Sequence, residues 1–306
     1  MRVLGLDSGG TKTLLAVALP TGQVTEFRQG PGLDPTAGKD WEQDLITLLQ
    51  PCAPMQAAVL GLAYFSEIPA ISARQTAIAQ AVLGLGAEVV NDVAVAYEGA
   101  LGGADGVLVL SGTGSMAWAR GPAGVVRCGG WGDVFGDEGS AYWIGRAALA
   151  LVSRHLDGRQ DAEAFAAGML DAIGIIGAEL IAWTYGQTQP RAAVAALARD
   201  VVALAEQNQD AAEIVRQAAA HLVEMGRSAA RRADLPRGHR WSFAGGVFAS
   251  DALRGAVTTG MGSPPTPPRL PPVGGAVIAA ARRAGWVVDE TFIATLAGSL
   301  ADGSQV

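Results

Sequence analysis

Two short glycine-rich segments combine the residue types that proteins use to hold polyphosphates. The first, Asp7 to Thr13, reads DSGGTKT, and the second, Ser111 to Ser115, reads SGTGS. Glycine lets backbone N–H groups approach phosphate oxygens, hydroxyl and ammonium groups donate hydrogen bonds, and a carboxylate can hold water around Mg²⁺. The first segment is not a Walker loop, because it lacks that spacing and enters a strand rather than a helix. Each segment alone is equally compatible with an ordinary β-turn, but the pair predicts a nucleotide clamped between two loops.

The residues of the two turns are therefore the candidates for phosphate binding. They are Gly9, Gly10, Thr11, Lys12, Gly112, Thr113, Gly114 and Ser115. Asp7 is the candidate residue for Mg²⁺, acting through a water molecule.

A lone carboxylate follows a short apolar segment. Asn91-Asp92 comes directly after Glu88 to Val90, at the position where α/β sheets present active residues. Phosphoryl transfer needs little more than one carboxylate to orient and deprotonate a hydroxyl, with other groups neutralising charge. An aspartate with an ordinary pKa of about 3.9 is ionised at neutral pH, so Asp92 is the candidate general base. The sequence fits equally well with Asp92 as the N-cap of a helix from Val93 to Ala100.

The segment from Gly129 to Ser140, GGWGDVFGDEGS, is the most unusual in the chain. An aromatic ring can form an apolar wall for a sugar, while carboxylates accept hydrogen bonds from vicinal hydroxyls. Trp131, Asp137 and Glu138 supply these groups. The alternative is a long glycine turn in which Asp137 caps the helix that begins at Ser140, and one carboxylate can do both.

The first hundred residues alternate strand-like and helix-like segments, which is typical of an α/β sheet. The turn at Gly9 lies between the apolar runs Val3 to Leu6 and Leu14 to Leu19, which predict a hairpin. Two further strand-like runs, Ala57 to Leu62 and Glu88 to Val90, are separated by a helical stretch from Ile71 to Gly84.

A second unit opens in the same way as the first. Gly106 to Leu110 enters the turn at Gly112, and Met116 to Ala119 leaves it. This similarity indicates either two related lobes that face one cleft or two unrelated hairpins. We therefore expect an N-terminal α/β lobe over residues 1–105 and a larger α/β lobe over 106–306, with about 288–306 packing back on the first lobe.

The rest of the second unit is mostly helical. Ala141 to about Arg232 is alanine-rich, with breaks near Gly158, Gly174 and Pro190. A strand from Trp241 then runs into a glycine turn, Ser250 can cap the next helix, and a proline-rich loop over 264–272 precedes a helix from Gly275 to Ala284.

Composition excludes several classes of protein. Of 306 residues, 50% are hydrophobic and 17% charged, which excludes a disordered solvating chain, and the apolar runs are too short to span a membrane. The net charge of -7 argues against a nucleic-acid partner. Cys52 and Cys128 are too few for a disulfide framework or a zinc cluster. With no signal-like segment before Asp7, we expect a cytoplasmic protein.

The motifs LDSGGTKT, ND at Asn91-Asp92, SGTGS, CGGWGDVFGDEGSAYWIG and FAGGVFAS follow one another in this order over nearly the whole chain. In this order they resemble the N-acetylglucosamine kinase family, part of the wider group of BadF/BadG-type ATPases in the actin-like, hexokinase-like superfamily. The stretch around GGWG and GDEGSAYWI is specific to the family, and the others are shared across the superfamily. The resemblance implies an α/β, two-lobed actin-like (ribonuclease H-like) fold with a central nucleotide and sugar cleft, and ATP with Mg²⁺ as cofactors.

The resemblance also implies roles for individual residues. Asp7 would assist Mg²⁺, Asp92 would be the base for the 6-hydroxyl of an amino sugar, and Thr113 would bind phosphate. The residues expected at the sugar are Thr11, Asp34, Asn91, Gly130, Trp131 and Asp137. Those expected at the nucleotide, besides the two turns, are Gly245, Gly246 and Ser250.

Two positions depart from the family pattern. Asp34 stands where such kinases tend to have an asparagine that touches the sugar, and a carboxylate there could favour a protonated amine over an acetamide. The sequence therefore leaves N-acetylglucosamine and free glucosamine open as substrates of a hexosamine kinase. Near the nucleotide the family has a Gly-Asp pair, whereas this chain has Gln209-Asp210. On that side the adenosine pocket therefore departs from the family pattern.

Two alternatives share the fold. One is an ATPase activator of a radical dehydratase or reductase, which holds an iron–sulfur cluster between two subunits and for which Cys52 and Cys128 are the available thiols. The other is a non-catalytic sugar sensor. Against the activator, Cys128 directly precedes the GGWG segment and neither cysteine lies in a cluster-like setting. Against the sensor, Asp92 and both phosphate turns are intact. A monomer and a homodimer both remain open.

Overall fold

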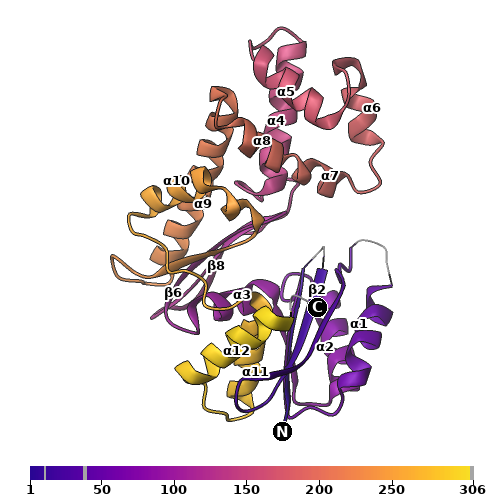
Figure 1. Cartoon of the computed structure of the whole chain (residues 1–306), viewed down its shortest axis with the longest axis vertical. Helices are drawn as coiled ribbons and strands as arrows, with labels where there is room; N and C mark the ends of the chain where they lie inside the picture. Colours follow the sequence, from indigo (N-terminus) through magenta and orange to yellow (C-terminus); the bar gives the residue numbers. More distant parts are fainter. Residues whose placement is uncertain (10–11, 37–39, 304–306) are drawn as a thin grey trace. The chain divides into compact units, whose positions relative to one another are not determined.

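The structure of the protein is a computed structural model that describes residues 1–9, 12–36 and 40–303. Its contacts divide the chain into two compact units (Figure 1). Unit 1 comprises Met1–Ala104 and Pro267–Val306, and unit 2 comprises Asp105–Thr266. Sequence analysis assigns residues 267–287 to the second lobe, but their contacts group them with unit 1.

The sheet of unit 1 has the strand order β3-β2-β1-β4-β5. Its strands are β1 (Val3–Ser8), β2 (Lys12–Ala18), β3 (Val24–Pro31), β4 (Ala57–Leu62) and β5 (Ala87–Asn91). β1, β2 and β3 form an antiparallel meander, and β4 and β5 run parallel to β1. Ser8 pairs with Leu62 and Leu62 with Asn91, so the carboxyl ends of the three parallel strands meet at one edge. This edge is where parallel sheets present functional residues.

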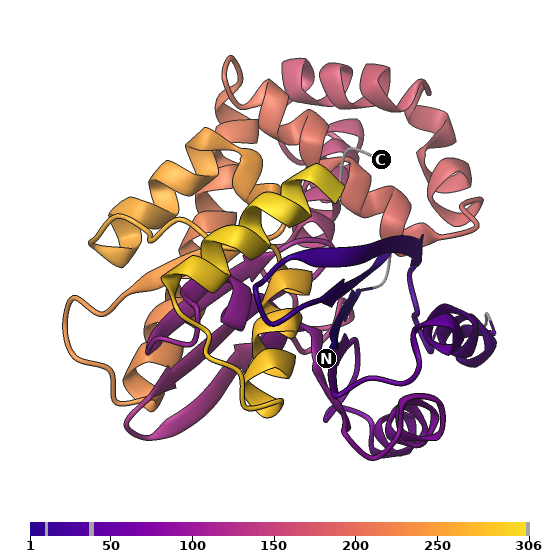
Figure 2. The ribbon, with the colours of Figure 1, turned by 60° about the horizontal axis from the view of Figure 1, so that its bottom comes forward.

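Helices cover both faces of this sheet (Figure 2). They are α1 (Trp41–Leu49), η1 (Gln50–Cys52), α2 (Pro69–Leu83), α3 (Asp92–Leu101), α11 (Pro272–Arg283) and α12 (Glu290–Gly303). One hydrophobic core joins the sheet to α1 and α2, and another joins it to α3, α11 and α12. The apolar residues of the parallel strands are buried on both sides, as a covered sheet requires.

Small residues explain why α11 belongs to unit 1. A Cβ on Gly275 would lie 2.0 Å from the carbonyl oxygen of Val95, and one on Gly99 would lie 2.8 Å from that of Pro271. A Cβ on Gly5 of β1 would lie 2.5 Å from the backbone nitrogen of Val277. Only glycine therefore permits α11 to approach α3 and β1 this closely.

The sheet of unit 2 has the order β8-β7-β6-β9. Its strands are β6 (Gly106–Ser111), β7 (Ser115–Gly121), β8 (Gly124–Gly129) and β9 (Trp241–Ala244). β6, β7 and β8 form an antiparallel meander, and β9 is parallel to β6. This repeats the arrangement of β1, β2, β3 and β4 in unit 1. The shared topology confirms the predicted internal repeat over two unrelated hairpins.

The helices of unit 2 are interrupted near the predicted breaks at Gly158, Gly174 and Pro190, and also at two unpredicted places, near Leu197 and between Leu204 and Gln209. They are α4 (Ala141–Leu156), α5 (Glu163–Ile173), η2 (Gly177–Glu179), α6 (Leu180–Tyr185), α7 (Pro190–Ala196), α8 (Ala198–Leu204), α9 (Gln209–Arg232), η3 (Gly246–Ala249) and α10 (Asp251–Met261). α9 packs against β6, β7 and β8 and buries Ile214, Val215 and Leu222. No single helix in the described part of the chain has the length and apolarity to cross a membrane, although the bent pair α5 with η2 and α6 passes that test together.

Candidate active site

In unit 1, two carboxylates lie beside the first glycine turn. Asp7 is near the end of β1, and Asp92 is the first residue of α3, directly after β5. A Cβ on Gly9 would lie 3.9 Å from Oδ2 of Asp92, which places this oxygen beside the turn. A Cβ on Gly61 of β4 would lie 3.3 Å from Cα of Asp92, so the absence of a side chain lets α3 start close to the sheet. The predicted base and the predicted metal residue therefore share one edge of the sheet.

The pKa of Asp7 is raised by its surroundings, which include the nearby carboxylate of Asp92. Burial and, to a smaller extent, the charge of Asp92 raise the pKa of Asp7 to about 7, while the charge of Lys12 acts in the opposite direction. Near neutral pH, Asp7 in the free protein is therefore partly protonated. Among the described residues no three acidic, histidine or cysteine side chains form a metal cluster. Two carboxylates beside a phosphate-type turn are a donor set that fits Mg²⁺, because this ion keeps waters and takes few protein ligands when phosphates supply the rest.

Asn91, rather than Asp92, is the N-cap of α3. Its Oδ1 accepts a hydrogen bond from the backbone N–H of Val93 at 3.0 Å, and its Nδ2 donates to Phe65 O and, at 3.3 Å, to Glu67 Oε1. The interpretation of Asp92 as the cap is therefore wrong, although its Oδ1 also accepts from Val93 N–H. Asn91 is buried and its amide is engaged within the unit, so its contact with the sugar stays a prediction.

The loop that carries Asp34 is fastened to the first turn by a buried network. Thr13 Oγ1 donates to the carbonyl oxygen of Pro31 at 2.6 Å, so Ser8 Oγ, 2.6 Å from it, is the donor of that pair. Ser8 Oγ then accepts from the backbone N–H of Leu33 at 3.2 Å. The next residue, Asp34, accepts at Oδ1 from Thr36 N–H at 2.8 Å and from its hydroxyl at 2.7 Å.

Tyr64 and Ser66 follow β4 in a backbone conformation that residues other than glycine rarely adopt. Their φ angles are 64° and 65°, in the left-handed region. The hydroxyl of Tyr64 lies 3.4 Å from that of Thr36. Strain of this kind clusters at functional sites, yet no sequence motif indicated this loop.

In unit 2, hydroxyl groups fasten the second turn to the GDEGS segment. Ser111 Oγ donates to the carbonyl oxygen of Gly139 at 2.8 Å, and Ser115 Oγ donates to that of Glu138 at 2.7 Å. Thr113 is exposed at the apex of the turn. The side chain of Thr113 is therefore accessible to solvent, and its contact with phosphate stays a prediction.

The Gly245-Gly246 segment lies against the same turn. Gly245 has φ +96°, and a Cβ on it would lie 2.2 Å from the carbonyl oxygen of Ser111. Ser250 is the N-cap of α10, where its Oγ accepts from Leu253 N–H at 3.2 Å. The capping role predicted for Ser250 is thus confirmed, and the second turn and the predicted adenosine segment are neighbours.

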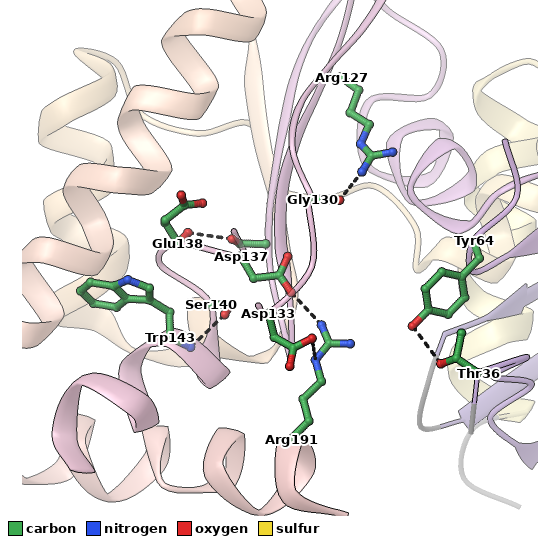
Figure 3. Close-up of polar contacts among 11 residues, drawn as sticks. Thr36, Tyr64, Arg127, Gly130, Asp133, Asp137, Glu138, Ser140, Trp143 and Arg191 are labelled. Atoms are coloured by element: carbon green, nitrogen blue, oxygen red, sulfur yellow. Dashed lines mark hydrogen bonds and ion pairs between the residues drawn. The ribbon is translucent and has the colours of Figure 1, made fainter. Parts of the chain in front are cut away.

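Asp137 lies in the interior of unit 2, paired with an arginine that sequence analysis did not single out (Figure 3). The Asp137 side chain is only 4% exposed, its φ is 55°, and its Oδ2 lies 2.7 Å from Nη2 of Arg191 on α7. Nε of the same guanidinium lies 3.6 Å from Oδ1 of Asp133. Burial raises the pKa of Asp137, and Arg191 lowers it. The helix cap is Ser140, whose Oγ accepts from Trp143 N–H, so the prediction that Asp137 caps this helix is wrong.

A weak signal for Arg191 was present in the sequence. It follows Pro190, which begins α7, and a cation in the first turn of a helix is unfavourable toward the helix dipole. An arginine at this unfavourable position suggests an ion-pair partner outside the helix. That partner is Asp137, 54 positions away in the chain.

The model of the BadF/BadG/BcrA/BcrD ATPase family matches residues 4–280. The chain belongs to this family.

Two relatives with related activities support the assignment to the BadF/BadG/BcrA/BcrD ATPases. An N-acetylmuramic acid/N-acetylglucosamine kinase of Clostridium acetobutylicum is 29% identical over 215 residues, which is 65% of this chain and 69% of the relative. A crystal structure from Chromobacterium violaceum, of a protein with a proposed N-acetylglucosamine kinase activity, is 28% identical with a TM-score of 0.74, covering 90% of this chain and 98% of that one.

A more distant structure supports the fold alone. A glucokinase of the ROK family from Streptomyces griseus, solved with glucose and AMPPNP, is 15% identical with a TM-score of 0.60, covering 92% and 99% of the two chains. This BadF/BadG-type chain therefore has the predicted α/β, two-lobed actin-like fold.

Trp131 is exposed in the segment of this ATPase that sequence analysis links to a sugar. Its side chain is 68% exposed, and the Arg127 guanidinium carbon lies 5.6 Å from its ring centroid. Arg127 also donates to the carbonyl oxygen of Gly130, which has φ +71°. An exposed indole with a fixed neighbour is available for stacking on an apolar sugar face.

Each unit of the BadF/BadG-type chain thus gathers its own share of the predicted residues. Unit 1 brings together Asp7, Gly9, Asp92 and Asn91 at one sheet edge, and unit 2 brings together Gly112, Gly114, Ser115, Gly245 and Asp137. Gly10 and Thr11 lie outside the described residues. The meeting of both sets in one cleft remains a prediction.

Proposed function

We propose that this protein is an ATP-dependent hexosamine kinase that transfers the γ-phosphate of MgATP to the 6-hydroxyl of N-acetylglucosamine or glucosamine. The observation that carries the proposal is the placement of Asp92 beside the first glycine turn, next to a second carboxylate suited to Mg²⁺. The named activities of the relatives from Clostridium acetobutylicum and Chromobacterium violaceum support it.

The chemistry requires one proton acceptor and several positive or hydrogen-bonding groups. The substrate oxygen bonds to the γ-phosphorus while the bond from this phosphorus to the β–γ bridging oxygen breaks, and ADP leaves. Asp92 orients the hydroxyl and takes its proton. Lys12 and the two turns hold the phosphates, and Asp7 would hold Mg²⁺, which supplies charge neutralisation when bound.

The local structure of Asp34 favours the acetylated sugar as the first candidate. One carboxylate oxygen of Asp34 accepts two hydrogen bonds from Thr36, which gives the residue a turn-forming role of its own. Free glucosamine stays the second candidate, because a carboxylate in this loop would attract a protonated amine.

The iron–sulfur alternative is disfavoured by the position of one cysteine. Cys52 is 0% exposed in the core of unit 1, where it cannot reach a cluster held between subunits. Both cysteines are free thiols, which suits the cytoplasmic location we propose. The net charge of -7 supports small-molecule partners over nucleic acid. A monomer and a homodimer are both compatible with the proposed activity.

A coupled assay of ADP release across N-acetylglucosamine, glucosamine, glucose and N-acetylmannosamine tests the proposal. We expect N-acetylglucosamine or glucosamine to give the highest kcat/KM, with ADP formed only when sugar is present. ADP release at one rate with every sugar and without sugar would contradict the proposal, because it would indicate an ATPase rather than a sugar kinase.

A further inference from the structure

We propose that Arg191 is a positioning residue that keeps the buried Asp137 ionised and oriented as a hydrogen-bond acceptor for a sugar hydroxyl. The inference rests on the proposed function and adds a residue to its site. Arg191 lies on α7, far in sequence from the motifs that the family resemblance singles out.

The first support is geometric. Nη2 of Arg191 lies 2.7 Å from Asp137 Oδ2, a hydrogen-bonded ion pair that fixes the carboxylate plane (Figure 3). The same pair lies against the second glycine turn, because a Cβ on Gly114 would be 2.9 Å from Asp137 Oδ2 and 3.2 Å from Arg191 Nη2. One guanidinium thus positions the predicted sugar acceptor directly beside the predicted phosphate turn.

The second support is an unused donor. Nε of Arg191 is buried and makes no hydrogen bond within the described residues, and its neighbour Asp133 is 3.6 Å away. Buried polar atoms are rarely left unsatisfied, so an orphaned donor indicates a missing partner. A substrate oxygen or a small movement of Asp133 would satisfy it.

The third support is the balance of charge around Asp137. Arg191 on α7, the backbone N–H of Ser115 on β7 and Asp133 on the same loop face its carboxyl group. The turn from Gly112 to Ser115 carries no titratable side chain, and in α4 only Tyr142 is titratable before Arg146. Arg191 is therefore the cation that opposes burial, which is the larger effect and leaves the pKa of Asp137 raised, and that opposes the negative charge of Asp133.

Loss of this cation would change what Asp137 can do. A carboxylate accepts hydrogen bonds with both oxygens, whereas its protonated form keeps one acceptor and turns the other oxygen into a donor. Without Arg191, burial and Asp133 would drive Asp137 to protonate at a higher pH, and its affinity for sugar hydroxyls would fall there.

The test compares Arg191→Met, Arg191→Lys and the control Arg199→Met, an exposed arginine on the neighbouring α8. We expect Arg191→Met to raise the KM for N-acetylglucosamine roughly 10-fold or more at pH 7, as for loss of a charged hydrogen bond. The KM for ATP should change less, and the acid limb of kcat/KM for the sugar should move to higher pH. Arg191→Lys should recover part of the effect, and Arg199→Met should match the wild type.

A second readout is independent of activity. The protein is labelled with ¹³C at its aspartate carboxyl groups, and the Asp137 resonance is assigned by its loss in Asp137→Asn. This resonance should titrate at a higher pH in Arg191→Met than in the wild type. Its titration midpoint in Arg191→Lys should lie between those two. An unchanged titration would overturn the inference even if the enzyme is a hexosamine kinase. If no hexosamine is phosphorylated, the proposed function fails together with the sugar role of Asp137, while the titration still decides whether Arg191 controls its ionisation.

Discussion

Asp7 and Asp92 lie at one sheet edge, and we propose different roles for them. Burial and the neighbouring Asp92 raise the pKa of Asp7 to about 7, so in the free protein this residue is the one that shares a proton with solvent near neutral pH. Binding of MgATP should therefore release a proton and strengthen as pH rises toward 7.

Replacing Asp7 with asparagine should stabilise the ligand-free protein at pH 8 but not at pH 4. The pKa of Asp7 rises from 3.8 to about 7 on folding, so between these values the folded state binds more protons than the unfolded state. Its contribution to stability therefore falls as pH rises through this window, and asparagine removes the loss. The gain in melting temperature for Asp7→Asn over wild type should grow from pH 4 to pH 8.

Asp44→Asn is the control, because Asp44 is exposed on α1. Its effect on melting temperature should be small at both pH values. A gain for Asp7→Asn of equal size at pH 4 and pH 8 would show that the Asp7 carboxyl does not have a raised pKa.

Gly114→Ala should disturb the Asp137–Arg191 pair, whereas Gly112→Ala should not. A Cβ at Gly114 would lie 2.9 Å from Asp137 Oδ2, but at Gly112 no atom lies within 4 Å. Overpacking of the kind expected in Gly114→Ala typically lowers the free energy of unfolding by about 1–3 kcal/mol. A substitution at an unobstructed site, as in Gly112→Ala, typically changes it by about 0.5 kcal/mol or less. Urea denaturation of both variants measures the difference, and equal losses would argue against the packing described here.

Among the elements, α3 is held in place by a glycine on the strand beneath it. A Cβ on Gly61 would lie 2.3 Å from Cγ2 of Val95 and 3.3 Å from Cα of Asp92. The start of α3 can therefore reach the sheet edge only while β4 presents no side chain there.

Gly61→Ala should lower both stability and turnover. Displacing α3 moves Asp92, and a misplacement of about 1 Å can reduce kcat by roughly 100-fold. The double variant Gly61→Ala/Val95→Ala removes the closest clash and should recover part of the turnover. Gly30→Ala on β3, where no atom lies within 4 Å of the added Cβ, is the control. Full activity in Gly61→Ala alone would show that the absence of a side chain at position 61 does not set the position of Asp92.

Local patterns predicted the elements whose structure is decided by their own residues. The all-apolar run Ala57–Leu62 is β4 with the same bounds, since a strand buried on both faces needs no alternation. The edge strand Val24–Pro31 was not predicted, because it is half-exposed and its pairing depends on β2. The cap of α3 was assigned to the wrong neighbour, as Asn91 and Asp92 are both good caps. Arg191 was missed because its ion pair joins segments 54 positions apart.

At the scale of the whole molecule, the chain divides its chemistry between two units of related topology. Unit 1 carries the proposed base and the proposed metal carboxylate, and unit 2 carries a second turn, the GDEGS segment and the buried Asp137–Arg191 pair. A kinase reaction in this account needs both units, because the proton acceptor and the second phosphate turn belong to different ones.

The most direct test of the central claim is to identify the product of the wild-type enzyme and of Asp92→Asn with MgATP and N-acetylglucosamine. Phosphorus and proton NMR should show the phosphate on the 6-hydroxyl for the wild type. Asp92→Asn should still bind both ligands, seen as a rise in melting temperature, while its kcat falls about 10²-fold or more. Wild-type turnover in Asp92→Asn, with Asp44→Asn as the matched control, would contradict the account.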